Sequence, residues 1–153
     1  MEAELGASWT YEFASEQVDS VRGLLRRIWA PHGLKGPTCF KDACSQDACS
    51  APTVDLYVTT PECTAHSRMN HTPSAGDQRV SLETFWASLA YVRDQRPKVV
   101  VVENVSEPSS VGPMTGLLGR LAGYSLETGM LDPRSVAKMP IARERQYWVL
   151  TRD

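Results

Sequence analysis

The sequence predicts an α/β fold with a mostly parallel sheet, and two features of the chain support this prediction. Apolar runs typical of strands alternate with segments that have the spacing of amphipathic helices. The run Val99–Val102 consists of four consecutive valines, which is typical of a central parallel strand buried on both faces. With 153 residues, of which 42% are hydrophobic and 22% charged, the chain is predicted to form one domain with a substantial core.

Strands are predicted where β-branched and aromatic residues gather, and helices where apolar residues recur at helical spacing. In chain order, the predicted strands are Thr10–Ala14, Thr38–Phe40, Val54–Val58, Val99–Val102, Tyr124–Leu131 and Gln146–Leu150. The predicted helices are Val18–Trp29, Val80–Arg93 and Pro113–Leu121. Residues 33–52 and 132–140 are predicted to be connectors.

Composition and charge exclude several classes of protein. The net charge of −2 argues against a self-contained DNA-binding module. No apolar run approaches the roughly 18–20 residues of a membrane span, and the acidic start Met1–Glu4 is not a signal peptide. We therefore expect no membrane partner. We expect an intracellular protein with reduced thiols, located in the nucleus of a eukaryote or the cytoplasm of a prokaryote.

The four cysteines differ in their surroundings. Cys39, Cys44 and Cys49 are evenly spaced but lack the Cys-x-x-Cys pair typical of zinc sites, so no metal site is predicted. Cys63 follows Pro61, where the chain leaves a predicted strand, and α/β sheets bind ligands at the carboxyl ends of their strands. Cys63 is therefore either a nucleophile or a small buried hydrophobic residue.

Charged residues also occur at the ends of predicted strands. Glu16 follows the first strand and Glu103 follows the valine run, so both are candidates for ligand binding. The alternatives are an acid that stabilises a helix N-terminus and a strand-end acid that faces water. Arg143 and Arg145 point to the same side of an extended chain, either to bind an anion or base edge or simply to be solvated. Asp42, taken alone, is an ordinary loop acid.

Residues 64–79 are predicted to form a mobile catalytic loop that follows Cys63 directly. Polar and turn-forming residues dominate this segment, which lacks the periodicity of a helix or a strand. Loops of this length inside a compact domain are typically functional.

In their order along the chain, these motifs resemble those of the cytosine-C5 DNA methyltransferases. Pro61-Glu62-Cys63-Thr64 is similar to a Pro-Glu-Cys-Thr variant of that family's catalytic loop, and Glu103-Asn104-Val105 matches its Glu-Asn-Val motif. Residues 140–145 resemble the Gln-x-Arg-x-Arg motif, with Ile141 in place of the usual glutamine. The resemblance implies a Rossmann-like, S-adenosylmethionine-dependent methyltransferase fold for residues 1–153.

The resemblance also implies a reaction and a role for each site residue. Cys63 would add to C6 of a cytosine flipped out of double-stranded DNA, and C5 would then accept a methyl group from S-adenosylmethionine. Glu103 would hold the N3/N4 edge of the ring, and Arg145, assisted by Arg143, would bind O2. The other implied contacts are Glu16, Asp42 and Pro61 with the cofactor, and Asn104 and Ser67 with the substrate.

The chain departs from the family in what it lacks. No Phe-x-Gly-x-Gly cofactor loop precedes Glu16, and Met1–Gly6 resembles the tail of the helix that should follow such a loop. The target-recognition domain and the last family motifs also have no counterpart. We therefore expect a partial catalytic domain without its first central strand, which alone neither binds the cofactor well nor methylates. A second chain or domain would supply the missing parts. The alternative is a non-catalytic, methyltransferase-like interaction module.

Overall fold

The computed structural model describes residues 9–29, 38–45, 50–67 and 70–153. By their contacts, the residues form two compact units, Met1–Pro52 and Thr53–Asp153. The expected helix tail Met1–Gly6 and the cysteine Cys49 lie outside the described residues.

The first unit contains a pair of short parallel strands. β1 (Phe13–Ser15) pairs with β2 (Thr38–Phe40), and Ala14 lies opposite Cys39. The Glu16 backbone N–H donates to the Phe40 carbonyl at 3.1 Å, which continues the pairing just beyond both strands. The strand predicted at Thr38–Phe40 is confirmed, whereas the one predicted before it begins three residues later than expected, at Phe13.

The helix α2 (Asp19–Trp29) confirms the predicted element but not the face that the apolar spacing suggested would be buried. Trp29 and Arg22 are buried, while an apolar stripe at helical spacing is exposed: Val21, Leu24 and Ile28. Arg22 is buried because its guanidinium turns back to pair with Asp19 and to donate to the Gln17 carbonyl at 2.7 Å. A buried arginine needs such partners, and these are close to it in sequence.

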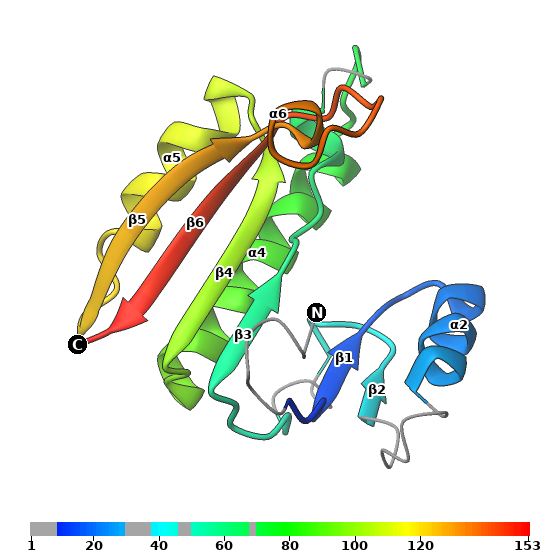
Figure 1. The fold of residues 1–153 in the computed structure, drawn as a ribbon, viewed down its shortest axis with the longest axis vertical. Coiled ribbons are helices and arrows are strands. Elements are labelled where there is room, and N and C mark those ends of the chain that lie inside the picture. Colours follow the sequence, from blue (N-terminus) through cyan, green and yellow to red (C-terminus); the bar gives the residue numbers. More distant parts are fainter. Residues whose placement is uncertain (1–8, 30–37, 46–49, 68–69) are drawn as a thin grey trace. The chain divides into compact units, whose positions relative to one another are not determined.

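The second unit is built on a four-stranded sheet in the order β3-β4-β6-β5. Its strands are β3 (Leu56–Thr59), β4 (Val99–Val105), β5 (Tyr124–Leu131) and β6 (Arg145–Arg152). β3 and β4 are parallel, and β6 is antiparallel to both of its neighbours, so β3, β4 and β5 point the same way (Figure 1). Among the described residues, β3 pairs only with β4 and β1 only with β2.

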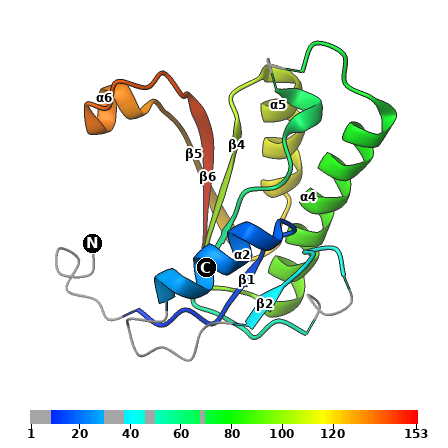
Figure 2. The same ribbon diagram turned by 90° about the vertical axis from the view of Figure 1, so that its right-hand side faces the viewer.

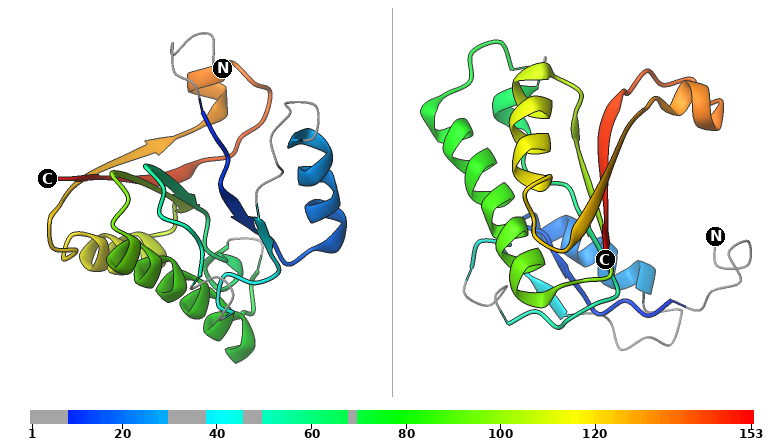
Figure 3. Two further views of the ribbon diagram at one scale, coloured as in Figure 1. Left: turned by 90° about the horizontal axis from the view of Figure 1, so that it is seen from below. Right: turned by 90° about the vertical axis from the view of Figure 1, so that its left-hand side faces the viewer.

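Two helices cover one face of this sheet. α4 (Ala75–Gln95) and α5 (Pro108–Leu118) lie on the same side of the strands (Figures 2 and 3). The core between helices and sheet consists of Phe85, Leu89, Val92, Val100, Val102, Met114, Leu118, Trp148 and Leu150. Val100 and Val102 lie opposite Leu150 and Trp148 in the register of β4 and β6, so this face of the sheet is continuously apolar. In the described part of the chain, no helix is both long enough and apolar enough to span a bilayer.

Two helices begin earlier than predicted, and local capping explains the early start of the first, α4. α4 begins at Ala75 rather than at Val80, since Ser74 and Asp77 form a reciprocal capping box. The predicted loop 64–79 is therefore shorter, with its last five residues in α4 and the 3-10 helix η2 (Thr64–His66) near its start. α5 begins at Pro108 rather than at Pro113.

Candidate active site

A charged pair joins the ends of two neighbouring strands in the second unit. The register places Glu103 of β4 opposite Tyr147 of β6, so Arg145 is its diagonal neighbour on the same face of the sheet. Arg145 Nε lies 2.9 Å from Glu103 Oε1, and the two side chains are only 24% and 20% exposed. Partial burial weakens the screening of this pair by solvent, so each charge strongly affects the groups around it.

Asn104, next in the chain after Glu103, fastens the cysteine loop to the end of β4. Its side chain is 3% exposed, and its Nδ2 donates to the Pro61 carbonyl at 3.2 Å. Its Oδ1 accepts from the Val105 backbone N–H at 2.8 Å. These bonds use the amide to connect β4 to the residue two positions before Cys63. The structure thus gives Asn104 and Pro61 a positioning role, while their expected contacts with substrate and cofactor stay predictions.

The loop that carries Cys63 is also attached to the first turns of α4. The Glu62 backbone N–H donates to Thr84 Oγ1 at 3.0 Å, and the Ala65 N–H donates to Ser81 Oγ at 3.4 Å. Ser67 lies in the turn that follows η2 and accepts from the Asn70 backbone N–H at 2.9 Å. Hydroxyl side chains on one face of α4 therefore position the backbone on both sides of Cys63.

The environment of Cys63 disfavours the ionised form of its thiol. Burial is the main cause that raises the pKa of Cys63 above its ordinary value, and the negative charges of Glu62 and Glu103 raise it further. The positive charge of Arg145 opposes them and lowers the same pKa. Glu103 and Arg145, which pair with each other, thus lie near enough to the thiol for their charges to act on it, although the three side chains come from different elements.

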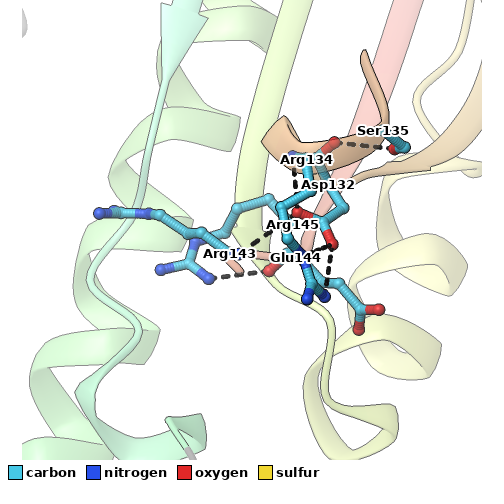
Figure 4. Close-up of polar contacts among 6 residues, drawn as sticks. All are labelled: Asp132, Arg134, Ser135, Arg143, Glu144 and Arg145. Atoms are coloured by element: carbon cyan, nitrogen blue, oxygen red, sulfur yellow. Dashed lines mark hydrogen bonds and ion pairs between the residues drawn. The ribbon is translucent and has the colours of Figure 1, made fainter. Parts of the chain in front are cut away.

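Asp132 organises the segment that precedes Arg145. It caps α6 (Pro133–Ala137) by accepting from the Arg134 backbone N–H at 3.0 Å, and it also pairs with the Arg134 guanidinium. Its carboxylate also accepts from the Arg143 backbone N–H at 3.5 Å (Figure 4). The guanidinium groups of Arg143 and Arg145 extend to the same side of this segment, as the sequence predicted, with Glu144 on the other side.

The two acids predicted to bind the cofactor lie at the carboxyl edge of the sheet in the first unit. Glu16 directly follows β1 and Asp42 follows β2 by two residues. Each carboxylate bonds to nearby backbone, because Glu16 Oε1 accepts from Val18 N–H at 2.8 Å and Asp42 Oδ1 accepts from Cys44 N–H at 2.9 Å. The contact of Glu16 matches the alternative of an acid at a helix start, and it uses one of the two carboxylate oxygens.

The sequence prediction did not include Glu62 or Asp132 among the site residues. Asp132 carries a readable signal, because an aspartate followed directly by a proline is typical of an N-cap and the first helical position. Glu62 directly precedes the candidate nucleophile, and its carboxylate contacts only the next two residues, so the local sequence contained a signal for it. Thr84 and Ser81 gave no signal, since hydroxyls on a predicted helix do not indicate what they contact.

Known structures share this fold over nearly the whole chain, although no protein-family model and no curated protein matches the sequence. Schizosaccharomyces pombe Dnmt2 methyltransferase has a TM-score of 0.64 and 19% identity, with 98% of this chain and 44% of that one covered. A mutant of Spodoptera frugiperda DNMT2 has a TM-score of 0.69 and 15% identity, with 98% and 45% covered. Thermus thermophilus TrmN has a TM-score of 0.61 and 15% identity, with 99% and 39% covered.

The chain spans less than half the length of each of these three structures. Their similarity covers both compact units and extends from the strands to the helices that pack on them. The chain has the α/β, Rossmann-like fold of the methyltransferases, in agreement with the family that its motifs resemble.

Proposed function

We propose that this chain forms the catalytic part of a cytosine-C5 DNA methyltransferase, with Cys63 as its nucleophile. The observation that supports the proposal is the shared site of Cys63, Glu103 and Arg145, which come from a loop, β4 and β6. A thiol, a carboxylate and a guanidinium are the three groups that addition to a cytosine ring requires.

Each residue has a distinct task in the proposed reaction. Cys63 gives its proton to water, and the thiolate forms a bond to C6 while N3 takes up a proton, which makes C5 an electron-rich enamine carbon; N3 gives this proton back when the aromatic ring is restored. Glu103 hydrogen-bonds the N3/N4 edge and Arg145 donates to O2, so that both hold the ring as its charge changes. After C5 has been methylated, it loses its proton, the C5–C6 double bond re-forms, and the sulfur leaves C6 as a thiolate.

Glu103 and Arg145 pair with each other in this structure, and each would exchange that partner for the ring. Their separation of 2.9 Å leaves no room for a base between the bonded atoms. A cytosine that enters the site therefore has to open the pair. Its amine and carbonyl edges offer replacements, since the ring presents donors to Glu103 and an acceptor to Arg145.

The acids of the first unit fit the cofactor that this reaction needs. Glu16 and Asp42 place two carboxylates at the carboxyl edge of parallel strands, where hydroxyl and amine donors of a nucleoside are bound in α/β folds. We propose that Glu16 accepts from the ribose hydroxyls and that Asp42 contacts the adenine. S-adenosylmethionine, when bound, would supply the methyl group for C5. A second chain or domain would complete the sheet and select the DNA sequence.

A mechanism-based trap tests the nucleophile with the full chain. The probe is a DNA duplex that carries one mismatched 2-pyrimidinone, a base whose C6 accepts a thiolate without methyl transfer. A mismatch lowers the cost of flipping the base out of the helix. Mass spectrometry should find a covalent adduct on Cys63, and the Cys63→Ala variant should form none.

The matched control is Cys44→Ala, since Cys44 is an exposed thiol in the first unit. This variant should form the adduct as the parent chain does. An adduct that survives in Cys63→Ala would overturn the assignment of the nucleophile. No adduct in the parent chain would favour the non-catalytic interaction module.

A further inference from the structure

Cys63, the proposed nucleophile, lies at the start of η2, where a neighbouring residue has to cap the helix. Cys63 is the N-cap residue of η2, yet its side chain makes no capping hydrogen bond. N-cap residues are usually Ser, Thr, Asp or Asn, whose oxygens accept from the first free backbone N–H groups. A sulfur is a weak acceptor and, in the proposed reaction, has to stay available to the ring. The free N–H groups at this turn therefore need another acceptor.

Glu62 supplies that acceptor. Its Oε1 accepts from the backbone N–H groups of Cys63 and Thr64, both at 2.9 Å, and it also bonds to the Thr64 hydroxyl. The carboxylate folds back over the start of η2 and bonds to the two residues that follow it. Because one of these N–H groups belongs to Cys63 itself, the carboxylate constrains the backbone from which the sulfur projects.

The backbone at Glu62 is also fixed by hydrogen bonds to other elements. Its N–H donates to Thr84 Oγ1 of α4, and the carbonyl just before it, that of Pro61, accepts from the buried Asn104. Glu62 therefore connects two rigid elements, α4 and β4, to the turn that carries Cys63. Because its backbone is fixed, the carboxylate of Glu62 can in turn fix the N–H groups that bond to it.

We propose that Glu62 is a positioning residue for the proposed reaction, in which its carboxylate caps the turn at Cys63 and so fixes the direction of the sulfur. This inference rests on the proposed function, because it gives the direction of the sulfur a purpose. It adds a residue that the family resemblance does not assign.

The same carboxylate also brings a charge, and the charge and the cap can be separated. Among the described residues, the charges that act on the Cys63 thiol are those of Glu62 and Glu103, which raise its pKa, and that of Arg145, which lowers it. Glu62→Gln keeps an oxygen for the two N–H groups but removes the charge. Glu62→Ala removes both. If the carboxylate is a cap, hydrogen exchange should differ between the two variants, because only Glu62→Gln keeps the acceptor. The pH profile of Cys63 alkylation should be similar in both, because both lack the charge.

The first measurement is hydrogen exchange at the Cys63 and Thr64 amides. Both amides should exchange about tenfold faster or more in Glu62→Ala, because their acceptor is lost. Their protection should be retained in Glu62→Gln. The control is Glu83→Gln, an exposed acid on α4 whose ion pair is with Arg79, and it should leave both amides unchanged. Unchanged exchange of both amides in Glu62→Ala would overturn the proposal.

The second measurement is the pH profile of Cys63 alkylation by iodoacetamide, read residue by residue by mass spectrometry. Glu62→Gln should shift the profile to lower pH and alkylate several-fold faster at neutral pH, since the negative charge is gone. A profile identical to that of the parent chain would contradict the placement of the carboxylate beside the thiol.

The trap with 2-pyrimidinone then connects the cap to the reaction. Adduct formation should be retained in Glu62→Gln and slowed in Glu62→Ala, because only the glutamine keeps an oxygen that can cap the turn and hold the sulfur in position. Equal adduct rates in both variants would overturn the positioning role. Exchange and alkylation need no nucleic acid, so a parent chain that forms no adduct would count against the proposed function and leave the cap intact.

Discussion

The two sheets of this molecule end in different kinds of polar site. At the carboxyl ends of β3 and β4, side chains far apart in the sequence contact one another, as in the bonds from Arg145 to Glu103 and from Asn104 to Pro61. At the carboxyl ends of β1 and β2, the carboxylates of Glu16 and Asp42 each accept from a backbone N–H two residues away. The first site is assembled by tertiary structure, whereas the carboxylates of the second are held by local turns.

This difference shows which of the two polar sites has a fixed geometry. Long-range contacts in the second unit fix the cysteine loop against β4 and α4, and the packed core beneath them makes that arrangement costly to change. The acids in the first unit can reorient at the cost of one exposed hydrogen bond each. We therefore expect mutations to have large effects in the second unit and small ones in the first.

The largest effect on stability is expected for Trp148→Ala. Trp148 is fully buried in β6, and its Nε1 donates to Thr115 Oγ1 at 2.7 Å. Truncation should cost about 3–5 kcal/mol in the free energy of unfolding. Urea denaturation followed by circular dichroism measures this cost. A loss below about 1 kcal/mol would show that the core under the candidate active site is not packed as described.

Asn104→Ala should be next in size. The buried Pro61 carbonyl and Val105 N–H would each lose a partner, at a cost of about 1–3 kcal/mol per unsatisfied group. The cysteine loop would also lose its connection to β4, so alkylation of Cys63 at alkaline pH should become faster. The control is Arg79→Ala, which removes only the exposed ion pair between Arg79 and Glu83 on α4. Equal stability of Asn104→Ala and the parent chain would contradict the positioning role.

The cap by Asp132 should depend on pH. The Arg134 backbone N–H is the main cause that lowers the pKa of Asp132, with help from the Arg134 guanidinium and the Arg143 N–H. Its contribution to stability is therefore present above the ordinary carboxyl pKa and is lost as the pH falls through the lowered value. An NMR titration should show the Arg134 amide signal shifting in that acidic range. A signal that does not move, or that moves identically in Asp132→Asn, would exclude the cap.

The smallest effects are expected in the first unit. Glu16→Gln and Asp42→Asn keep a side-chain oxygen for the local N–H group, so each should change the free energy of unfolding by less than about 1 kcal/mol. In the proposed enzyme, completed by the second chain or domain that we propose, the same variants should weaken binding of S-adenosylmethionine, as measured by calorimetry. Large destabilisation by either would mean that these acids are structural rather than held for a ligand.

The sequence predicted what depends on local pattern. β5 at Tyr124–Leu131 and β2 at Thr38–Phe40 have the predicted bounds. Turn-forming residues flank them in the sequence, with a glycine before Tyr124, Asp132-Pro133 after Leu131 and a proline before Thr38. The early start of α4 was missed because a capping box of polar residues looks like a loop when apolar spacing is the signal. The exposed stripe of α2 was missed for the opposite reason, since spacing predicts a helix but not what covers it.

The candidate site divides in the same way. Cys63, Glu103 and Arg145 could be named from their places after or before predicted strands, and the structure brings them together. The contact between Glu103 and Arg145 depends on a register that no local pattern contains. The burial of Asn104 likewise follows from two segments 43 residues apart in the chain that meet at its amide. The sequence therefore indicated the participants, and tertiary pairing set their roles.

The most direct test of the central claim is the pKa of Cys63 in two variants of the full chain. If the thiol, Glu103 and Arg145 share one site, Glu103→Gln should lower the pKa of Cys63 and Arg145→Gln should raise it. Residue-resolved alkylation as a function of pH measures both. Opposite shifts around the parent value are the predicted result. The same pKa in both variants and the parent chain would contradict the shared site.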